Sequence, residues 1–261
     1  MTEKLLARKE GRIGIVTFNN PERHNAMSLE MWEATVHHLN EYAKDPEVRV
    51  LVLTGAGSKA FVSGADISKF EDERSSTEGI ARYNAAVERG YATVHGFPKP
   101  TIAMIRGYCI GGGLGLASCC DIRICSQNSR FAVPAAKLGL GYDYPGLKRL
   151  ADLVGPSFTK EIFFTARQFD AEEARIMGLV NRVVPSADLE KYVKDYAGVI
   201  AGNAPLTVGS VKFIVGEALK DSGKRDLDAM AKSVKRCFAS KDYVEGRTAF
   251  MEKRKPVFTG G

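Results

Sequence analysis

The sequence predicts an α/β fold over residues 1–195 and a helical C-terminal region over residues 196–261. Through about residue 185, apolar segments typical of buried strands alternate with segments typical of helices, which is the pattern of a sheet with parallel strands. Only helical segments follow Pro185. At the centre, residues 105–121 join a buried strand to a small, apolar helix through three glycines.

The first half of the chain supplies most of the expected strands. Residues 5–19 alternate around Gly11, as in a hairpin. Ser28 is a good N-cap for a helix that runs to about Lys44 and is stopped by Pro46. The other elements expected here are strands at 48–54, 101–105 and 121–125, a strand and loop at 131–140, and helices at 78–94 and from the glycines to 119.

The second half is expected to be almost entirely helical. Because no strand pattern separates the last helices, we expect them to form a region distinct from the α/β core, with the boundary at residue 195. The helices expected in this half lie at 146–153, 157–165, 171–177, 187–201, 205–221, 224–239 and 242–253.

Composition excludes several classes of protein. The 261 residues are 44% hydrophobic and 26% charged, as is usual for a globular protein. The longest apolar runs are far shorter than the ~20 residues that span a bilayer, so we expect no membrane partner. The first residues, Met-Thr-Glu-Lys, lack the apolar segment of a secretion signal, and we therefore expect a cytoplasmic protein.

Charge and cysteine content point to a small anionic ligand and a reducing compartment. The net charge is +6, but no helix carries a dense Lys/Arg stripe, so a nucleic-acid partner is disfavoured. The five cysteines are odd in number and lie mostly in apolar segments, which is typical of buried free thiols. No Cys or His pair has a zinc-like spacing, so we expect no metal site.

The glycine triplet at 111–113 allows two interpretations. Glycine at the start of a helix permits unusual backbone angles and leaves the first N–H groups free to bind an anion or a developing oxyanion. The alternative is a tight turn that lets the helix pack closely. The glycines alone do not decide between these interpretations.

A second segment, residues 61–67, follows the strand at 50–54, and together the two segments resemble the enoyl-CoA hydratase/isomerase (crotonase) superfamily. The resemblance implies a crotonase (ClpP-like) spiral of ββα units, with C-terminal helices that assemble a homotrimer or a dimer of trimers. It implies an acyl-CoA substrate and no separate cofactor, since coenzyme A enters with the substrate. It is carried by Asn20-Pro21, Asn25-Ala26, Gly64-Ala65-Asp66-Ile67, Gly111-Gly112-Gly113, Gly178-Leu179-Val180 and residues 250–258.

The resemblance also implies the roles of individual residues. The backbone N–H groups of Ala65 and Gly112 would bind the thioester oxygen and stabilise an enolate. Arg23 and His24 lie in the loop that wraps the pantetheine and nucleotide in the family. The other residues expected to bind substrate or coenzyme A are Ala26, Gly64, Asp66, Ile67, Gly111 and Ala135, with Lys255 and Phe258 of the tail contributed by a neighbouring subunit.

Two glutamates that move protons and position water in family hydratases are absent. Their positions are Gly115, two residues beyond the triplet, and Ala135, after Phe131-Ala-Val-Pro134. A positioned acid or base typically contributes roughly 10²–10⁴-fold to a rate, so ordinary hydration is in question.

The loop at 139–144 supplies the remaining candidates, Tyr142 and Asp143. The loop and the tail partly resemble methylmalonyl-CoA decarboxylase, in which a tyrosine falls where Tyr142 lies. An aspartate at 143 is instead typical of dienoyl-CoA isomerase and 4-chlorobenzoyl-CoA dehalogenase. Decarboxylation needs no base, whereas isomerisation would need Asp143. The alternatives are that both are ordinary turn residues, or that the protein is a non-catalytic homologue that binds CoA esters or RNA.

Overall fold

The structure is a computed structural model that describes residues 2–66 and 76–261. Its larger sheet has the order β1-β2-β3-β5-β7-β10, and its smaller sheet has the order β4-β6-β8-β9. The strands of the larger sheet are β1 (Leu5–Glu10), β2 (Ile13–Phe18), β3 (Val50–Gly55), β5 (Thr101–Ile105), β7 (Ile122–Ser126) and β10 (Arg182–Val184). Those of the smaller sheet are β4 (Ala60–Val62), β6 (Tyr108–Ile110), β8 (Arg130–Ala132) and β9 (Phe169–Asp170).

From β3 to β8, consecutive strands alternate between the two sheets, and this alternation produces a spiral. The pairs β3/β4, β5/β6 and β7/β8 each place one strand in each sheet. Successive turns run in the same direction, so the pairings within β3-β5-β7 and within β4-β6-β8 are parallel. Among the described strands, the edge pairs β1/β2 and β8/β9 are the antiparallel ones. The predicted spiral of ββα units is therefore confirmed.

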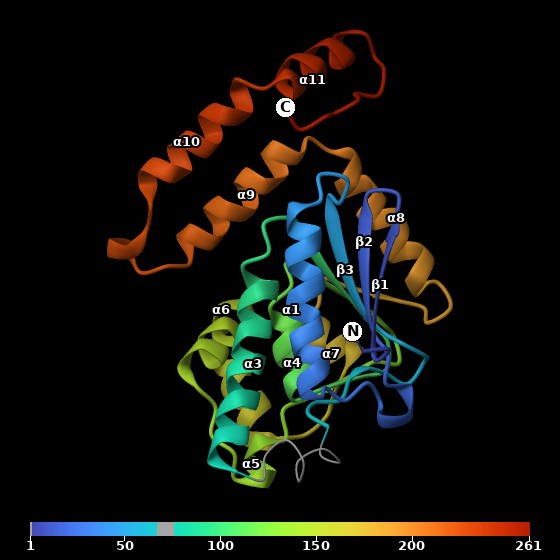
Figure 1. The fold of residues 1–261 in the computed structure, drawn as a ribbon, viewed down its shortest axis with the longest axis vertical. Coiled ribbons are helices and arrows are strands. Elements are labelled where there is room, and N and C mark those ends of the chain that lie inside the picture. The colour runs from blue at the N-terminus through green and yellow to red at the C-terminus, as the bar shows by residue number, and fades with distance from the viewer. Residues whose placement is uncertain (1, 67–75) are drawn as a thin grey trace.

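The helices cover the sheets and extend beyond them (Figure 1). Helix α4 lies inside the spiral, with four of its seven residues Gly or Ala, so it fits where larger helices would not. The helices are α1 (Leu29–Lys44), α3 (Thr77–His95), α4 (Gly112–Ser118), α5 (Ala135–Leu138), α6 (Tyr144–Thr165), α7 (Ala171–Ile176), α8 (Leu189–Gly202), α9 (Pro205–Ala218), α10 (Leu227–Phe238) and α11 (Lys241–Met251).

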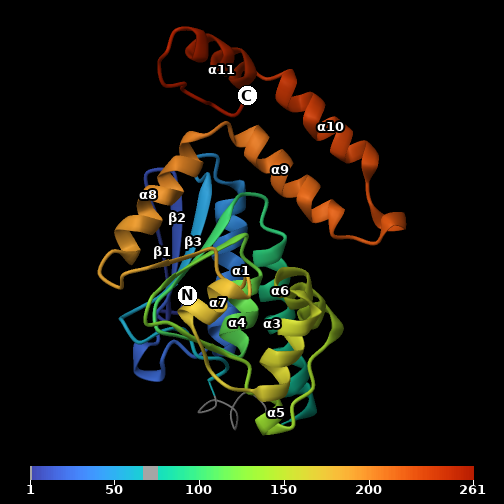
Figure 2. The same ribbon diagram turned by 180° about the vertical axis from the view of Figure 1, so that it is seen from behind.

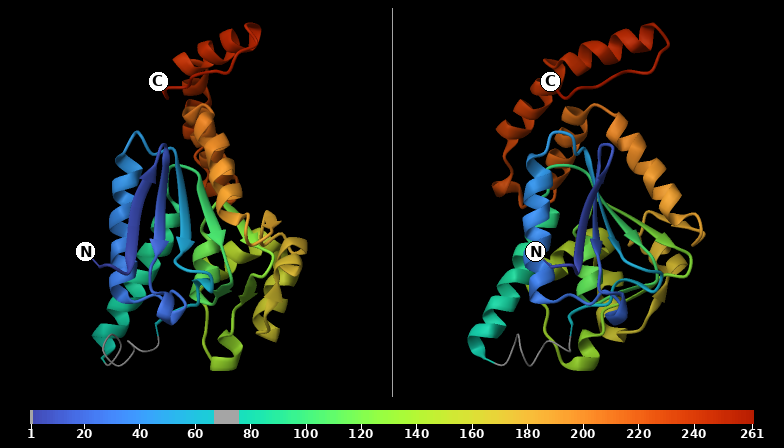
Figure 3. Two further views of the ribbon diagram at one scale, coloured as in Figure 1. Left: turned by 90° about the vertical axis from the view of Figure 1, so that its right-hand side faces the viewer. Right: turned by 45° about the vertical axis from the view of Figure 1, so that its right-hand side comes forward.

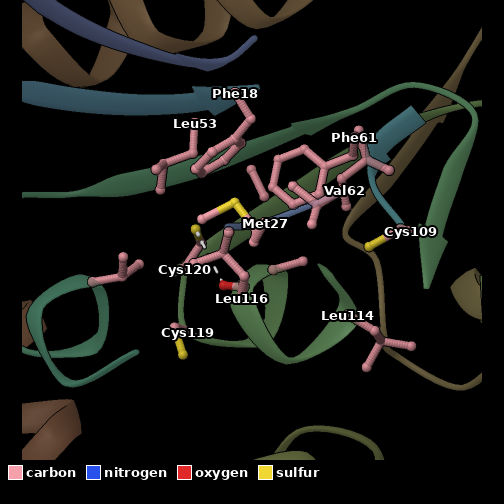
Figure 4. Close-up of a cluster of buried hydrophobic side chains, with 14 of the residues drawn as sticks. Phe18, Met27, Leu53, Phe61, Val62, Cys109, Leu114, Leu116, Cys119 and Cys120 are labelled. Atoms are coloured by element: carbon pink, nitrogen blue, oxygen red, sulfur yellow. Dashed lines mark hydrogen bonds between the residues drawn. The ribbon is translucent and has the colours of Figure 1, made fainter. Parts of the chain in front are cut away.

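The main apolar core lies between the larger sheet and helix α4 (Figure 4). Phe18 and Phe61 meet edge to face with ring centroids 5.7 Å apart. Leu116 of α4 and Met27 are both almost fully buried in the same cluster. This core fixes α4 relative to β4 and β6, the strands that lead into the glycine turn.

Most elements lie where the sequence predicted them, and the differences have local causes. The hairpin and the helix after Ser28 are confirmed. The two helices expected at 146–153 and 157–165 are the two parts of α6, which is kinked where Gly155, with φ +78°, precedes Pro156. The strands β4, β6 and β10 are three residues long, too short for an alternation pattern to identify.

Helix α8 is part of the core. Its residues Val193, Ala197 and Ala201 are buried against the outer face of the larger sheet. The boundary expected at residue 195 falls inside this continuous helix, which ends at Gly202. Figures 2 and 3 show α10 and α11 standing away from the sheets, with α9 between them and the core.

No single helix among residues 2–66 and 76–261 is long and apolar enough to cross a membrane. The pair α8 and α9 meets that test only jointly, and it is bent by 102°.

Candidate active site

The glycine triplet forms the turn between β6 and α4, and each glycine has its own structural reason. Gly111 has φ +55°, a conformation that few other residues adopt. A Cβ at Gly113 would lie 2.0 Å from the Val62 carbonyl oxygen, so α4 can approach β4 only through a glycine. A Cβ at Gly112 would make a tight contact of 3.2 Å with the Tyr91 hydroxyl oxygen and would lie 3.8 Å from the Cα of Gly64. The triplet therefore serves close packing, and the same packing brings Gly112 beside the Gly64 segment.

The Ala65 segment is fixed by a parallel bridge to Met27. The Met27 N–H donates to the Gly64 carbonyl over 2.8 Å, and the Asp66 N–H donates to the Met27 carbonyl over 3.0 Å. In such a bridge, the N–H of the central residue points away from the bridging strand. The N–H of Ala65 is therefore directed away from Met27.

Two unpaired backbone donors result from this geometry. Within residues 2–66 and 76–261, neither the Ala65 N–H nor the Gly112 N–H donates a hydrogen bond. Gly112 is the first residue of α4, where an N–H has no acceptor within its own helix and where the helix dipole is positive. These two neighbouring donors suit a carbonyl oxygen that acquires negative charge.

The space beside Gly115, where the resemblance implies a glutamate in hydratases, is filled by a side chain that sequence reasoning missed. A Cβ at Gly115 would lie 2.9 Å from the hydroxyl oxygen of Tyr91 in α3. That hydroxyl donates to the Gly112 carbonyl over 3.0 Å. Burial first, and then Cys119 and Tyr142, raise the pKa of Tyr91 well above its ordinary value, so the phenol is neutral at physiological pH.

The second glutamate position, Ala135, faces inward. Ala135 begins α5 and is 4% exposed, so an apolar methyl group lies where the resemblance implies a carboxylate in hydratases. Tyr142 follows in the next loop, with its ring edge to face against Phe163 at 4.8 Å. Tyr142 is 38% exposed, and burial of the rest of the ring raises its pKa.

Asp143 is exposed and occupies the N-cap position of α6 without a side-chain capping hydrogen bond. Its backbone carbonyl accepts the Leu147 N–H over 3.2 Å. This placement agrees with the turn interpretation of Asp143, and a role in catalysis stays a prediction.

The residues expected to hold coenzyme A fall into two groups. Arg23 and His24 are exposed, and the His24 carbonyl accepts a hydrogen bond from the Ser63 N–H. Their loop therefore lies beside the Ala65 segment. Ala26 and Asp66 are buried on either side of the Met27 bridge. Ile67 lies outside the described residues.

The tail residues form the second group and lie elsewhere. The Phe258 carbonyl accepts from Arg49 over 2.6 Å, and its ring lies against Gly246 of α11. Figure 1 shows α11 and the C-terminus at the opposite end of the molecule from α5. Within one chain, the structure therefore does not bring Lys255 or Phe258 to the Ala65 and Gly112 donors.

The described residues contain no group of three or more side chains suited to hold a metal ion.

Comparison with known proteins identifies the family. Residues 8–261 match the profile of the family described as enoyl-CoA hydratase/isomerase. The chain belongs to the enoyl-CoA hydratase/isomerase family. It is 36% identical over 251 residues to the short-chain-enoyl-CoA hydratase of Clostridium acetobutylicum, a match that covers 96% of this chain and 95% of the relative.

Two further family members show the same full-length agreement. The carnitinyl-CoA dehydratase of Salmonella typhi is 33% identical over 267 residues and is covered completely. The crystal structure of an enoyl-CoA hydratase/carnithine racemase from Magnetospirillum magneticum superposes with a TM-score of 0.94 at 37% identity, covering 100% of this chain and 97% of the other. The crotonase fold expected from the sequence is confirmed by these neighbours.

Proposed function

We propose that the protein acts on acyl-CoA thioesters through an enolate whose oxygen is held by the backbone N–H groups of Ala65 and Gly112. The observation that carries this proposal is the pair of unpaired donors created by the Met27 bridge and the glycine turn. Donors fixed at a developing oxyanion are worth several kcal/mol in the transition state. Arg23 and His24 lie beside the Ala65 segment and are suited to contact the pantetheine or the phosphates of coenzyme A.

Decarboxylation of a carboxyacyl thioester is the reaction that this site supports best. The bond between Cα and the carboxylate breaks, CO₂ leaves, and the electron pair forms the enolate. Cα then takes a proton from a phenol or from water, and water restores the phenol. No step requires a carboxylate base, and neither Gly115 nor Ala135 supplies one.

Double-bond isomerisation ranks second because it requires a base. Asp143 is the carboxylate in the neighbouring loop, but it is exposed and occupies the N-cap position of α6, as an ordinary turn residue does. Hydration, the reaction in the printed names of two relatives, lacks both family glutamates in this chain.

Mass spectrometry of a panel of CoA esters tests the assignment. The panel holds enoyl, dienoyl and branched malonyl thioesters, incubated with wild type, Tyr142→Phe and Asp143→Asn. We expect loss of CO₂ from a malonyl ester, weakened in Tyr142→Phe and retained in Asp143→Asn. Isomerisation that is lost in Asp143→Asn would favour the second candidate, and water addition to a short enoyl ester would refute the emphasis on the missing glutamates.

A binding role is the remaining alternative, and ligand protection distinguishes it. CoA thioesters should raise the thermal unfolding midpoint more than free carboxylic acids do if Ala65 and Gly112 bind the thioester oxygen. Protection without turnover of any panel member would indicate a non-catalytic CoA-ester protein. A salt-dependent shift of RNA in a gel at micromolar protein would indicate the RNA-binding alternative.

We further propose a homotrimer or a dimer of trimers in the cytoplasm. The last helices expose many large apolar side chains, which a monomer in water would not favour. Among them are Val211, Val215, Leu219, Leu227, Phe238, Val244, Phe250 and Met251. Light scattering coupled to size exclusion should give three or six times the 28.4 kDa chain mass, and a monomer would contradict the proposal.

A further inference from the structure

Helix α3 carries two tyrosines whose hydroxyl groups both end on backbone carbonyls. Tyr83 donates to the Met27 carbonyl over 3.1 Å. Tyr91 donates to the Gly112 carbonyl over 3.0 Å. The two tyrosines are eight residues apart, on the row of side chains that an α-helix presents every fourth residue. One helix face therefore reaches two segments that are 85 residues apart in the sequence.

These two segments position the two donors of the proposed oxyanion hole, the N–H groups of Ala65 and Gly112. We call the segment Gly64–Asp66 the Ala65 arm and the glycine turn the Gly112 arm. The Met27 carbonyl that receives Tyr83 also receives the Asp66 N–H, which fixes the residue directly after Ala65. The carbonyl that receives Tyr91 belongs to Gly112, the residue that contributes the second free N–H. Each hydroxyl is thus bonded at or next to one of the two donors.

Close packing against α1 fixes the position of α3. A Cβ at Gly90 would lie 2.4 Å from the Trp32 ring, so α3 contacts α1 at the closest distance that glycine allows. The Trp32 and Tyr91 rings meet edge to face with centroids 5.1 Å apart. Since α1 begins directly after Met27 and Ser28, the same contact ties α3 to the Ala65 arm.

We propose that Tyr83 and Tyr91 are positioning residues that set the separation and direction of the Ala65 and Gly112 N–H groups. The inference rests on the proposed function, since it assigns these tyrosines to the hole named there. Preorganised donors act only if their geometry is fixed before the reaction, and misplacement by about 1 Å costs on the order of 10²-fold in rate. Because both hydroxyls belong to α3, their hydrogen bonds hold the Ala65 and Gly112 segments in fixed positions relative to the same helix and therefore to each other.

The alternative is that both hydroxyls only satisfy buried carbonyls, as most buried polar groups must. The two roles differ in what a lost hydroxyl changes. A hydroxyl that only satisfies a carbonyl alters stability, whereas a positioning hydroxyl also alters the polarisation of a bound thioester carbonyl. The stretching frequency of that carbonyl is therefore the decisive measurement.

The experiment uses the full-length protein with butyryl-CoA labelled with ¹³C at its thioester carbonyl. Infrared difference spectra compare wild type, Tyr83→Phe, Tyr91→Phe and the double variant. Tyr42→Phe is the matched control, because Tyr42 is a buried tyrosine at the far end of α1. Fluorescence of Trp32, the chain's one tryptophan, verifies that each variant is folded.

We expect the wild type and Tyr42→Phe to lower the carbonyl frequency of bound thioester equally, and each α3 variant to lose a measurable part of that shift. For the thioester that the wild type converts, kcat should fall roughly 10-fold in each α3 variant while KM changes by less than about 2-fold. Wild-type shifts retained in both folded α3 variants would overturn the positioning role. Absence of any shift in the wild type would instead overturn the proposed oxyanion hole.

Discussion

The approach of α4 to β4 makes Gly113→Ala the sharpest test of the site. The new Cβ would lie 2.0 Å from the Val62 carbonyl oxygen and 2.8 Å from its carbonyl carbon. Real Cβ atoms essentially never lie within 3.0 Å of a heavy atom of a residue that is not their neighbour in the chain. A backbone carbonyl cannot rotate away from such a contact as a flexible side chain can. The helix and the strand must therefore separate by about 1 Å.

The magnitude follows from two opposing effects. Alanine is favoured over glycine inside a helix by about 1 kcal/mol, whereas overpacking of a well-packed core costs about 1–3 kcal/mol and occasionally more. Because the clash is between backbone segments, we expect a net loss of about 2 kcal/mol in the free energy of unfolding. Separation of α4 from β4 also moves the Gly112 N–H away from the Ala65 arm, so kcat should fall roughly 100-fold.

Gly198→Ala is the matched control. Gly198 lies inside α8, and a Cβ there meets no atom within 4 Å, so the same substitution should stabilise the protein by about 0.5–1 kcal/mol. Urea unfolding followed by Trp32 fluorescence measures both variants at one protein concentration. If Gly113→Ala were as stable and as active as Gly198→Ala, the close approach of α4 to β4 would be refuted.

Three further changes test neighbouring parts of the molecule. Asn25 is fully buried, its side-chain amide makes three hydrogen bonds, and its backbone has φ +57°, which alanine adopts less readily than asparagine. Asn25→Ala should therefore lower the free energy of unfolding by about 3–5 kcal/mol in urea titrations. The Arg254 guanidinium lowers the pKa of Glu245 to about 2. The ion pair therefore stabilises the tail above pH 4.5, and this stabilisation is lost as the pH falls from 4.5 towards 2. In Glu245→Gln, the thermal unfolding midpoint should fall less over that pH range than it does in the wild type. Gly115→Glu should destabilise the protein with Tyr91 present and much less in a Tyr91→Leu background, with a coupling above about 1 kcal/mol in a double-mutant cycle. An additive cycle would show that the phenol does not fill the space over Gly115.

The sequence by itself determined the elements whose signals are local. The hairpin around Gly11 and the helix after Ser28 follow from alternation and capping, which depend on neighbouring residues only. The glycine triplet and the Gly64–Asp66 segment could also be identified from the sequence, because the order of their small residues resembles that of the family. The absence of carboxylates at 115 and 135 also required no coordinates.

Only the tertiary structure decided how distant segments combine. The bridge that aims the Ala65 N–H joins Met27 to a residue 38 positions later, and no local pattern encodes such a pairing. No local pattern distinguishes Tyr83 or Tyr91, whose hydroxyls donate to the carbonyls of Met27 and Gly112 only in the folded chain. Hydrogen bonds between remote segments depend on the summed packing of the whole core, which is why the sequence named the two donors and the structure alone revealed what holds them.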